Sequence, residues 1–331
     1  MKKKILVTGG TGAMGRYLVP LLVKQGYKVD VVASDAFEST SPDLRYIVAN
    51  AKDRAFMEEL LKNDYDAVVD FMIYTTPFVR DWLHFYLERT SHYIYLSTYR
   101  VYADEEHPIK ETSPRLLDTL CDSNFLGTDD YALYKARGEN YLLTSEYRNW
   151  TAIRPAITYS SRRFQLVTLE MPNTVGRAFF GKKVVLPLEA KDKQATMTWA
   201  GDVAKMIAGL LFNPRAMREI YTVSTAEHRT WGEIAEYYRE LCGLECVWVT
   251  NEEFLESIGQ KGNPAAHWQL HYDRLFDRVI DNSKILDITG MKQEELMPLK
   301  EGLRYELAQL PRDIFENTET PMDRWLAEHD M

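Results

Sequence analysis

The segment Val7-Thr8-Gly9-Gly10-Thr11-Gly12-Ala13-Met14-Gly15 decides the fold of this 331-residue chain. It follows a short apolar run, Lys4–Val7, and precedes a stretch, ended by Gly26, whose apolar residues recur at helical spacing: Tyr17, Leu18, Leu21, Leu22 and Val23. Glycines at positions 9, 12 and 15 permit a tight turn, a close approach of the backbone to a pyrophosphate, and close packing of the helix on its strand. A turn without a ligand could use the same residues, but the order of strand, turn and helix favours an anion site at a helix N-terminus.

The composition is that of an ordinary globular chain, large enough for one extended domain or two lobes. The net charge of -9 disfavours a broad basic surface for nucleic acid, although it is compatible with a local basic pocket for a small phosphorylated molecule. The apolar run after Lys4 is too short for a secretion signal, and no membrane-spanning run appears elsewhere. We interpret the cysteines, Cys121, Cys242 and Cys246, as reduced thiols, and expect a cytoplasmic protein with neither a nucleic-acid nor a membrane partner.

Strand-like and helix-like segments alternate in the first half of the chain. The expected helices include Ala55–Lys62, which Asp53 caps, and Phe78–Glu88. The expected strands are Lys28–Ala33, Tyr46–Ala49, Ala67–Met72, Tyr93–Ser97 and Thr151–Ile153. This alternation predicts an α/β fold with a doubly wound parallel sheet.

The character of the chain changes after Arg154-Pro155. A strand-like segment, Val184–Leu186, and a helical segment, Gly201–Phe212, follow without a low-complexity linker. We therefore expect a dinucleotide-binding domain over residues 1–155 and a smaller mixed α/β substrate lobe over residues 156–331, interleaved with the first.

Tyr131 and Lys135 stand four residues apart in a helical segment, so both side chains fall on the same helix face. A nearby ammonium favours the phenolate form of a tyrosine, which makes Tyr131 a candidate acid/base, although the same spacing also occurs by chance. In the segment Tyr95–Tyr102, the end of a predicted strand delivers the hydroxyls of Ser97 and Thr98 to the carboxyl edge of the sheet. Ligands of open α/β folds bind at that edge.

Four motifs in this order resemble the extended short-chain dehydrogenase/reductase family: Thr8-Gly9-x-x-Gly12-x-x-Gly15, the hydroxyl pair before Val101-Tyr102, Tyr131-x-x-x-Lys135 with Glu139, and Arg154-Pro155. Within that family the chain is most similar to the NAD-dependent epimerase/dehydratase branch, from about residue 4 to about residue 310. The resemblance implies a Rossmann-type doubly wound parallel sheet with a smaller C-terminal substrate lobe and a bound nicotinamide cofactor.

The resemblance also implies three catalytic residues. Thr98 matches the catalytic serine or threonine of the family, Tyr131 matches the acid/base, and Lys135 matches the lysine that tunes it. The dehydratases of this branch carry an acidic pair after the threonine, whereas this chain has Tyr99 and Arg100. The resemblance therefore disfavours dehydration.

The cofactor-binding residues follow from the same resemblance. The glycine-rich turn would hold the pyrophosphate, Asn50 and Ala51 the adenine, Phe71 the ribose, and Pro155 the nicotinamide. Tyr131 and Lys135 would also contact the cofactor, and the turn contributes Gly9, Thr11, Gly12, Ala13, Met14 and Gly15.

The end of the second predicted strand bears on the choice between NAD and NADP. Ser34 and Asp35 lie there, and the Asp35 carboxylate suits a ribose diol and repels a 2′-phosphate, which favours NAD. Small Ala33 and Ser34 leave NADP open, and Asp35 could equally be a solvated loop residue.

The substrate-binding candidates are Thr98, Tyr99, Arg177 and Arg274. Arg274 is the first choice for a phosphate, because it precedes Asp281–Lys284 roughly as a phosphate-binding arginine does in the sugar epimerases. His267 and His271 are four residues apart, but without an HExxH pattern or an acidic ligand nearby they do not predict a metal site.

Three functions remain open from the sequence. The first is an NAD-dependent epimerase acting on a nucleotide-activated sugar through a transient keto intermediate. The second is an NAD(P)-dependent reductase or dehydrogenase of a small carbonyl or alcohol. The third is a non-catalytic relative that senses dinucleotides or binds RNA, because the chain is also similar to a branch that includes chloroplast RNA-binding proteins. Family relatives often dimerise, and we expect a homodimer through the helices near Phe78–Glu88 and Tyr131–Glu146.

Overall fold

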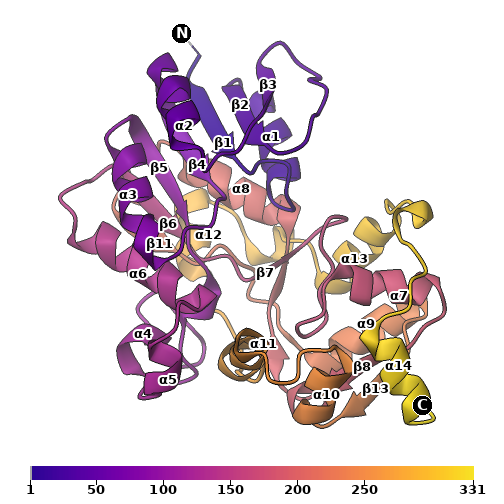
Figure 1. Cartoon of the computed structure of the whole chain (residues 1–331). Helices are drawn as coiled ribbons and strands as arrows, with labels where there is room; N and C mark the ends of the chain where they lie inside the picture. The colour runs from indigo at the N-terminus through magenta and orange to yellow at the C-terminus, as the bar shows by residue number, and fades with distance from the viewer. Residues whose placement is uncertain (1) are drawn as a thin grey trace.

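The computed structural model describes residues 2–331 and is built on a seven-stranded parallel sheet (Figure 1). The strand order is β11-β6-β5-β4-β1-β2-β3, so the chain winds outward in both directions from the β1/β4 pair. The strands are β1 (Lys4–Thr8), β2 (Lys28–Ala33), β3 (Leu44–Val48), β4 (Tyr65–Asp70), β5 (Thr90–Leu96), β6 (Trp150–Ile153) and β11 (Glu219–Tyr221). This arrangement confirms the Rossmann-type fold and places a topological switch point beside β1.

Helices cover both faces of this sheet. Along β1, Ile5 and Val7 pack in the cluster that includes α1 (Gly15–Lys24) and α8 (Ala200–Leu210), whereas Leu6 packs in the cluster of the opposite face. This alternation has the period of two that a strand imposes, and the strand is buried on both sides. The remaining sheet helices are α2 (Arg54–Leu60), α3 (Thr76–Leu87) and α6 (Tyr131–Thr144) on the face of Leu6, and α12 (Ser283–Thr289) on the face of α1.

The second lobe is built from short strand pairs and helices, and it holds its own hydrophobic core. Its pairs are β7 (Ile157–Tyr159) with β10 (Met197–Trp199), β8 (Val184–Pro187) with β13 (Cys246–Val249), and β9 (Gln194–Ala195) with β12 (Arg229–Thr230). Its helices are α7 (Val175–Phe179), α9 (Trp231–Cys242), α10 (Asn251–Ser257), α11 (Pro264–Gln269), α13 (Leu299–Leu307) and α14 (Pro321–Glu328). Two short helices, α4 (Leu116–Thr119) and α5 (Ser123–Leu126), precede α6.

The two lobes interleave along the chain. Helix α8, strand β11 and helix α12 all follow residue 155, yet they complete the sheet and the core of the first lobe. Glu306 of α13 ties the lobes together, because its carboxylate accepts hydrogen bonds from the Tyr17 hydroxyl of α1, from Trp199 Nε1 at 2.6 Å and from the Ser161 amide at 2.7 Å. The lobes are thus joined by these hydrogen bonds as well as by the chain segments that cross between them.

Candidate active site

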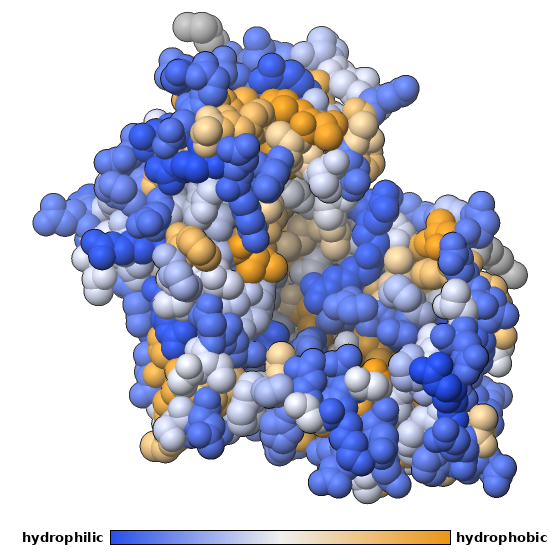
Figure 2. Space-filling view, viewed as in Figure 1, coloured by the Kyte–Doolittle hydropathy of each residue, from blue (hydrophilic) through white to orange (hydrophobic). Residues whose placement is uncertain are grey.

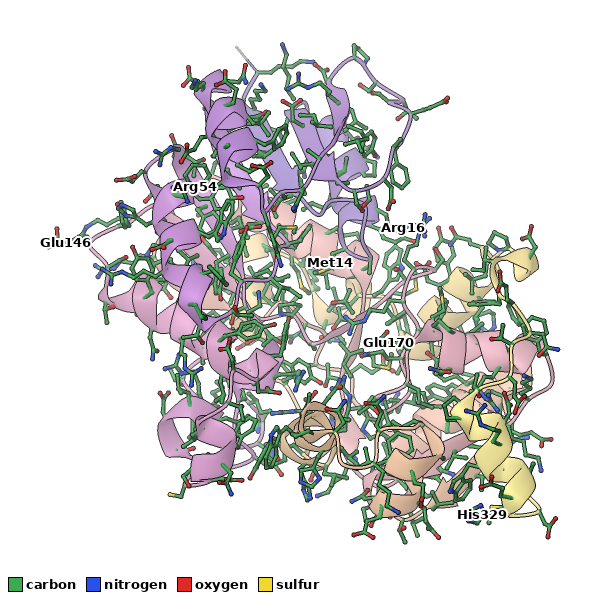
Figure 3. All side chains as sticks on the ribbon, in the orientation of Figure 1. Met14, Arg16, Arg54, Glu146, Glu170 and His329 are labelled. Atoms are coloured by element: carbon green, nitrogen blue, oxygen red, sulfur yellow. The ribbon has the colours of Figure 1, made fainter. Side chains whose placement is uncertain are left out.

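A cleft runs between the two lobes at the carboxyl edge of the parallel sheet, and Figure 2 shows the molecule hollowed there. Met14 lies on the first-lobe side of this cleft and Glu170 on the second-lobe side (Figure 3). One cavity, of about 480 Å³, is lined by Gly9, Thr11, Val32, Ala33, Ser34, Val48, Ala49, Asn50, Ala51 and Met72. The other, of about 370 Å³, is lined by Met14, Phe71, Ile73, Leu96, Thr98, Tyr99, Arg100, Tyr131, Pro155, Ala156, Ile157, Thr158, Arg163, Gln269 and Arg274.

The glycine-rich turn joins the end of β1 to the start of α1 and fits a pyrophosphate. Gly9 has a φ of +67°, a backbone conformation that favours glycine. A Cβ on Gly15 would lie 2.1 Å from the Gly10 carbonyl oxygen, so the helix can pack this closely only with glycine there. At Gly12, by contrast, the nearest atom to an added Cβ is the Gly9 oxygen at 3.5 Å, which leaves the turn open toward the cleft. The amides of Arg16 and Tyr17 in the first turn of α1 donate to the carbonyls of Gly12 and Met14, so an anion here would be met by the amides of the turn that precedes them.

Predicted cofactor-binding residues lie around the first cavity. Gly9 and Thr11 of the glycine-rich turn line it together with Ser34, Asn50 and Ala51, although they come from the ends of three different strands. The predicted Asp35 is exposed and is not among the described residues that line either cavity. Ser34, next to it, is therefore the residue of this pair that contacts the cavity.

The three predicted catalytic residues come together at the second cavity. Tyr131 begins α6, and the Asp130 side chain caps this helix by accepting a hydrogen bond from the Ala132 amide at 2.8 Å. Thr98 lies at the end of β5 with its side chain 4% exposed, and its hydroxyl accepts a hydrogen bond from the Arg100 amide at 3.2 Å. Thr98 and Tyr131 both line the cavity, as the sequence predicts for residues that act on one substrate.

Lys135 lies directly behind Tyr131 and is fully buried. Its Nζ donates a hydrogen bond to the Leu96 carbonyl at 2.5 Å and lies 5.8 Å from the centre of the Tyr131 ring. Burial lowers the pKa of Lys135 to about 8, although the carboxylates of Asp70 and Glu139 oppose this shift. The ammonium is therefore held close to its deprotonation range.

The electrostatics of Tyr131 differ from the expectation drawn from the sequence. Burial raises the pKa of the Tyr131 phenol, and the largest opposing charge is that of Arg100, followed by Arg163 and a hydrogen bond with Thr98. The sequence motif assigns this opposing role to Lys135 and gives no such role to Arg100. Because Arg100 follows Thr98 by two residues, the same strand end delivers both to the phenol.

A buried ion pair holds α6 in place. Glu139, on α6, accepts hydrogen bonds from Arg154 Nε and Nη2, both at 2.7 Å, and from Arg115 Nη1 at 2.9 Å. The Ser97 hydroxyl also donates to Glu139. Arg154 holds the pKa of the Glu139 carboxyl below its usual range against the opposing effect of burial. This network links the ends of β5 and β6 to α6 and explains why Glu139 and Arg154 accompany the catalytic motif.

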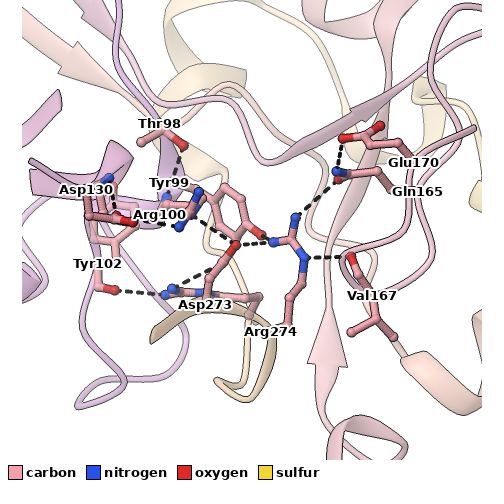
Figure 4. A network of polar contacts seen from close by, with 12 residues as sticks. Thr98, Tyr99, Arg100, Tyr102, Asp130, Gln165, Val167, Glu170, Asp273 and Arg274 are labelled. Atoms are coloured by element: carbon pink, nitrogen blue, oxygen red, sulfur yellow. Dashed lines mark hydrogen bonds and ion pairs between the residues drawn. The ribbon is translucent and has the colours of Figure 1, made fainter. Parts of the chain in front are cut away.

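The second lobe contributes an arginine and an aspartate through a single π-helical turn, Leu270–Arg274. Arg274 donates hydrogen bonds to the Val167 carbonyl at 2.7 Å and to the Tyr99 hydroxyl at 2.8 Å, and it also contacts the Asp273 carboxylate (Figure 4). Burial raises the pKa of Tyr99 to about 12. Turns of this type often occur at functional sites, and here two consecutive side chains point inward. Arg274 lines the second cavity as expected, while Asp273, Arg163 and Gln269 were not predicted.

The other predicted substrate arginine, Arg177, lies elsewhere. Its guanidinium donates to the Lys183 carbonyl at 2.7 Å, to the Thr320 hydroxyl at 3.0 Å and to Asp323 at 2.8 Å. Thr320 and Asp323 lie at the start of α14 and Lys183 directly before β8, and Arg177 is not among the described residues that line either of the two cavities. Because its donors are taken up by these protein groups, Arg177 has a structural role and we do not propose it as a substrate ligand.

In residues 2–331, no group of three or more His, Cys, Asp or Glu side chains is arranged to hold a metal ion. Over the same residues, no helix has both the length and the apolar character needed to cross a lipid bilayer.

The chain belongs to the NAD-dependent epimerase/dehydratase family, whose model matches residues 5–224. It is therefore an NAD-dependent enzyme of the extended short-chain dehydrogenase/reductase type, as the four motifs predict. Among curated proteins it is similar to the chloroplast stem-loop binding protein of 41 kDa b of Arabidopsis thaliana, with 25% identity over 276 residues, which cover 76% of this chain and 68% of that protein.

Two solved structures illustrate the likeness in fold. An epimerase from Methanothermobacter thermautotrophicus superposes with a TM-score of 0.71 at 16% identity, covering 99% of this chain and 93% of that chain. UDP-glucose 4-epimerase from Thermus thermophilus, solved in complex with NAD, has a TM-score of 0.65 at 19% identity, covering 92% of this chain and 98% of that chain. Both comparisons support the overall fold described above.

Proposed function

We propose that this protein is an epimerase that acts on a nucleotide-activated sugar. The observation that carries this proposal is that Thr98, Tyr131 and Arg274 line one cavity, so that a hydroxyl, a phenol and a cation face the same substrate. The solved neighbours that bear epimerase names support the same activity. The absence of an acidic pair after Thr98, where Tyr99 and Arg100 stand, argues against the loss of water from the sugar.

Each residue of the cavity has a distinct chemical role in the proposed reaction. NAD, when bound, supplies reversible hydride transfer at the reacting carbon. Tyr131 takes the proton of the sugar hydroxyl and later returns it, while the Thr98 hydroxyl hydrogen-bonds to the same oxygen. The phenolate is favoured by the charge of Arg100, whose guanidinium carbon lies 5.3 Å from the centre of the Tyr131 ring, while Lys135 lies behind that ring at 5.8 Å. After oxidation the keto sugar turns, so that the hydrogen returns to the opposite face of the ring.

We further propose that the glycine-rich turn holds the pyrophosphate of NAD and that Ser34, Asn50 and Ala51 surround the adenosine. The open space at Gly12 and the position of the turn at the N-terminus of α1 support this placement. Phe71 and Pro155, which line the second cavity beside Tyr131, would border the nicotinamide end. Asp35 follows Ser34 on the exposed edge, where its charge would disfavour a 2′-phosphate.

The nucleotide that leaves the denatured protein tests this function. We expect the absorption spectrum and the mass of NAD in the released material, because an enzyme that returns its hydride has no need to exchange the cofactor. Incubation with UDP-glucose or UDP-glucuronate should then yield the epimer while absorbance at the NADH wavelength stays constant. Net formation of NADH would instead support a dehydrogenase, and an empty site that prefers NADP would contradict both the epimerase and the role of Asp35.

We do not propose nucleic-acid binding, although the Arabidopsis relative is named for a stem-loop. The net charge of -9 opposes a polyphosphate chain, whose affinity for proteins rests on clusters of cations. A tight, salt-dependent complex of the purified chain with stem-loop RNA would contradict this view.

We also propose a homodimer formed through the outer faces of α3 and α6. These two helices pack side by side and leave the large apolar residues Phe78 and Leu143 60% and 45% exposed. Sedimentation should therefore give about twice the chain mass of 38.5 kDa, and a monomeric mass would contradict the proposal.

A further inference from the structure

The substrate cavity has an unusual balance of charge. Three arginines, Arg100, Arg163 and Arg274, are among its lining residues, whereas the described residues that line it include neither aspartate nor glutamate. Arg163 is paired with the exposed Glu170 at 3.3 Å, whereas Arg100 and Arg274 reach the fully buried Asp273 carboxylate from different elements (Figure 4). The wall that a substrate meets beside Arg100 and Arg274 is therefore cationic.

Asp273 cannot neutralise the cations that surround it. Its carboxylate is fully buried and lies 3.3 Å from Arg100 Nε and 3.4 Å from Arg278 Nη2, in addition to its contact with Arg274. With Asp130, which lies 3.6 Å from Arg100 Nη2, two carboxylates face three guanidinium groups, of which Arg274 and Arg278 are only 3% and 2% exposed. The cluster therefore keeps a net positive charge, and because an uncompensated buried charge is costly, it favours an anionic ligand.

Arg100 and Arg278 both have nitrogens without a hydrogen-bond partner among residues 2–331, and of these two Arg100 is the one that lines the cavity. The ion-pair partners of Arg100 lie at 3.3 Å (Asp273) and 3.6 Å (Asp130), longer than the 2.7–2.9 Å of a charge-assisted hydrogen bond. Its unpartnered atom is the buried Nε. The side chain nevertheless lines the cavity, and it is 13% exposed.

Arg100 also lies close to the place of reaction. Its guanidinium carbon is 5.3 Å from the centre of the Tyr131 ring, and its backbone amide donates to the Thr98 hydroxyl. An anion held by Arg100 would therefore belong to a part of the substrate close to the oxygen that Tyr131 and Thr98 contact. A phosphate on the far side of a sugar nucleotide does not meet this requirement.

We infer that the sugar substrate carries a carboxylate on the carbon next to the reacting one, and that Arg100 binds this carboxylate. The inference rests on the proposed epimerase function and narrows its substrate to the nucleotide-activated uronic acids. The planar guanidinium matches a carboxylate in geometry, which a neutral hydroxymethyl group at the same carbon does not.

Binding measurements with two sugars that differ only at this carbon test the inference. Calorimetry would compare UDP-glucuronate with UDP-glucose on the NAD-loaded Tyr131→Phe variant, in which turnover does not disturb the titration. We expect UDP-glucuronate to bind about tenfold or more tightly, as a hydrogen bond to a charged group predicts. Arg100→Gln should abolish this preference, Arg100→Lys should keep part of it, and Arg162→Gln, which removes an exposed arginine that does not line the cavity, should keep all of it.

The outcomes separate this inference from the proposed function. Equal binding of the two sugars, or a preference that survives Arg100→Gln, would overturn the carboxylate assignment and leave the epimerase proposal standing. Binding of neither sugar would overturn the nucleotide-sugar function and the inference with it. Retained NAD and an unchanged melting temperature in each variant would show that a lost preference does not come from misfolding.

Discussion

Replacement of Tyr131 by phenylalanine is expected to lower kcat by about 100- to 10,000-fold, the usual contribution of a positioned acid/base. The phenol is the group of the cavity that can take the substrate proton, because Lys135 is fully buried and is not among the described residues that line the cavity, and Thr98 carries only an alcohol. Phenylalanine keeps the ring that packs at the start of α6, so folding and retention of NAD should be unchanged. Epimer formation followed by NMR, together with the nucleotide content of the purified variant, measures both effects.

Tyr134→Phe is the matched control for this change. Tyr134 lies on the same helix, its ring contacts that of Tyr131 with a centroid separation of 5.4 Å, and it is not among the residues lining the cavity. Loss of this second hydroxyl should alter kcat by less than about threefold. If Tyr131→Phe retains more than a tenth of the wild-type rate while Tyr134→Phe behaves as wild type, another group performs the proton transfer and the mechanism is wrong.

Glu139→Gln is expected to lower the free energy of unfolding by about 3–5 kcal/mol, as breaking a buried ion pair does. The Glu139 carboxylate receives both Arg154 hydrogen bonds and one from Arg115, and Arg154 is only 2% exposed. The amide removes the negative charge and leaves the buried Arg154 guanidinium uncompensated. Urea unfolding followed by circular dichroism measures the loss.

The pH dependence of this loss gives a second readout. Because the pKa of Glu139 is lowered in the folded protein, its stabilising contribution is present above the ordinary glutamate pKa of about 4.3 and disappears as the pH falls through the folded value. The difference between wild type and Glu139→Gln should therefore be full at pH 7 and shrink in acid. Glu146→Gln, which changes an exposed glutamate on the periphery (Figure 3), should cost less than about 0.5 kcal/mol. A constant difference across this pH range would contradict the role of the ion pair.

Much of the first lobe could be predicted because its signals are local. β2 was predicted as Lys28–Ala33 and has these bounds, and Asp53 caps α2 as expected. Each of these features depends on residues adjacent in the chain, on strand periodicity or on the chemistry of a cap. The proposed catalytic residues also rest on local sequence motifs, since Thr98 follows a strand end and Tyr131 and Lys135 share one helix turn.

The second lobe was less predictable because its contacts join distant residues. Arg177 looked like a free cation in the sequence, but its partner Asp323 lies 146 positions further along the chain. The inward position of both Asp273 and Arg274 depends on a π-helical turn, which a search for helical periodicity does not reveal. The influence of Arg100 on Tyr131 likewise depends on packing between the end of β5 and the start of α6.

The return of the chain to the first lobe after residue 155 constrains how such an enzyme can evolve. Because β11 pairs with β6 and α8 packs on α1, a new substrate lobe could not be introduced at one recombination point without removing part of the cofactor-binding core. Several matched junctions would be needed at once, which makes exchange of whole modules a poor route to new specificity. Changes of substrate are more readily reached by single replacements at strand ends that border the cleft, and position 100 is one such place.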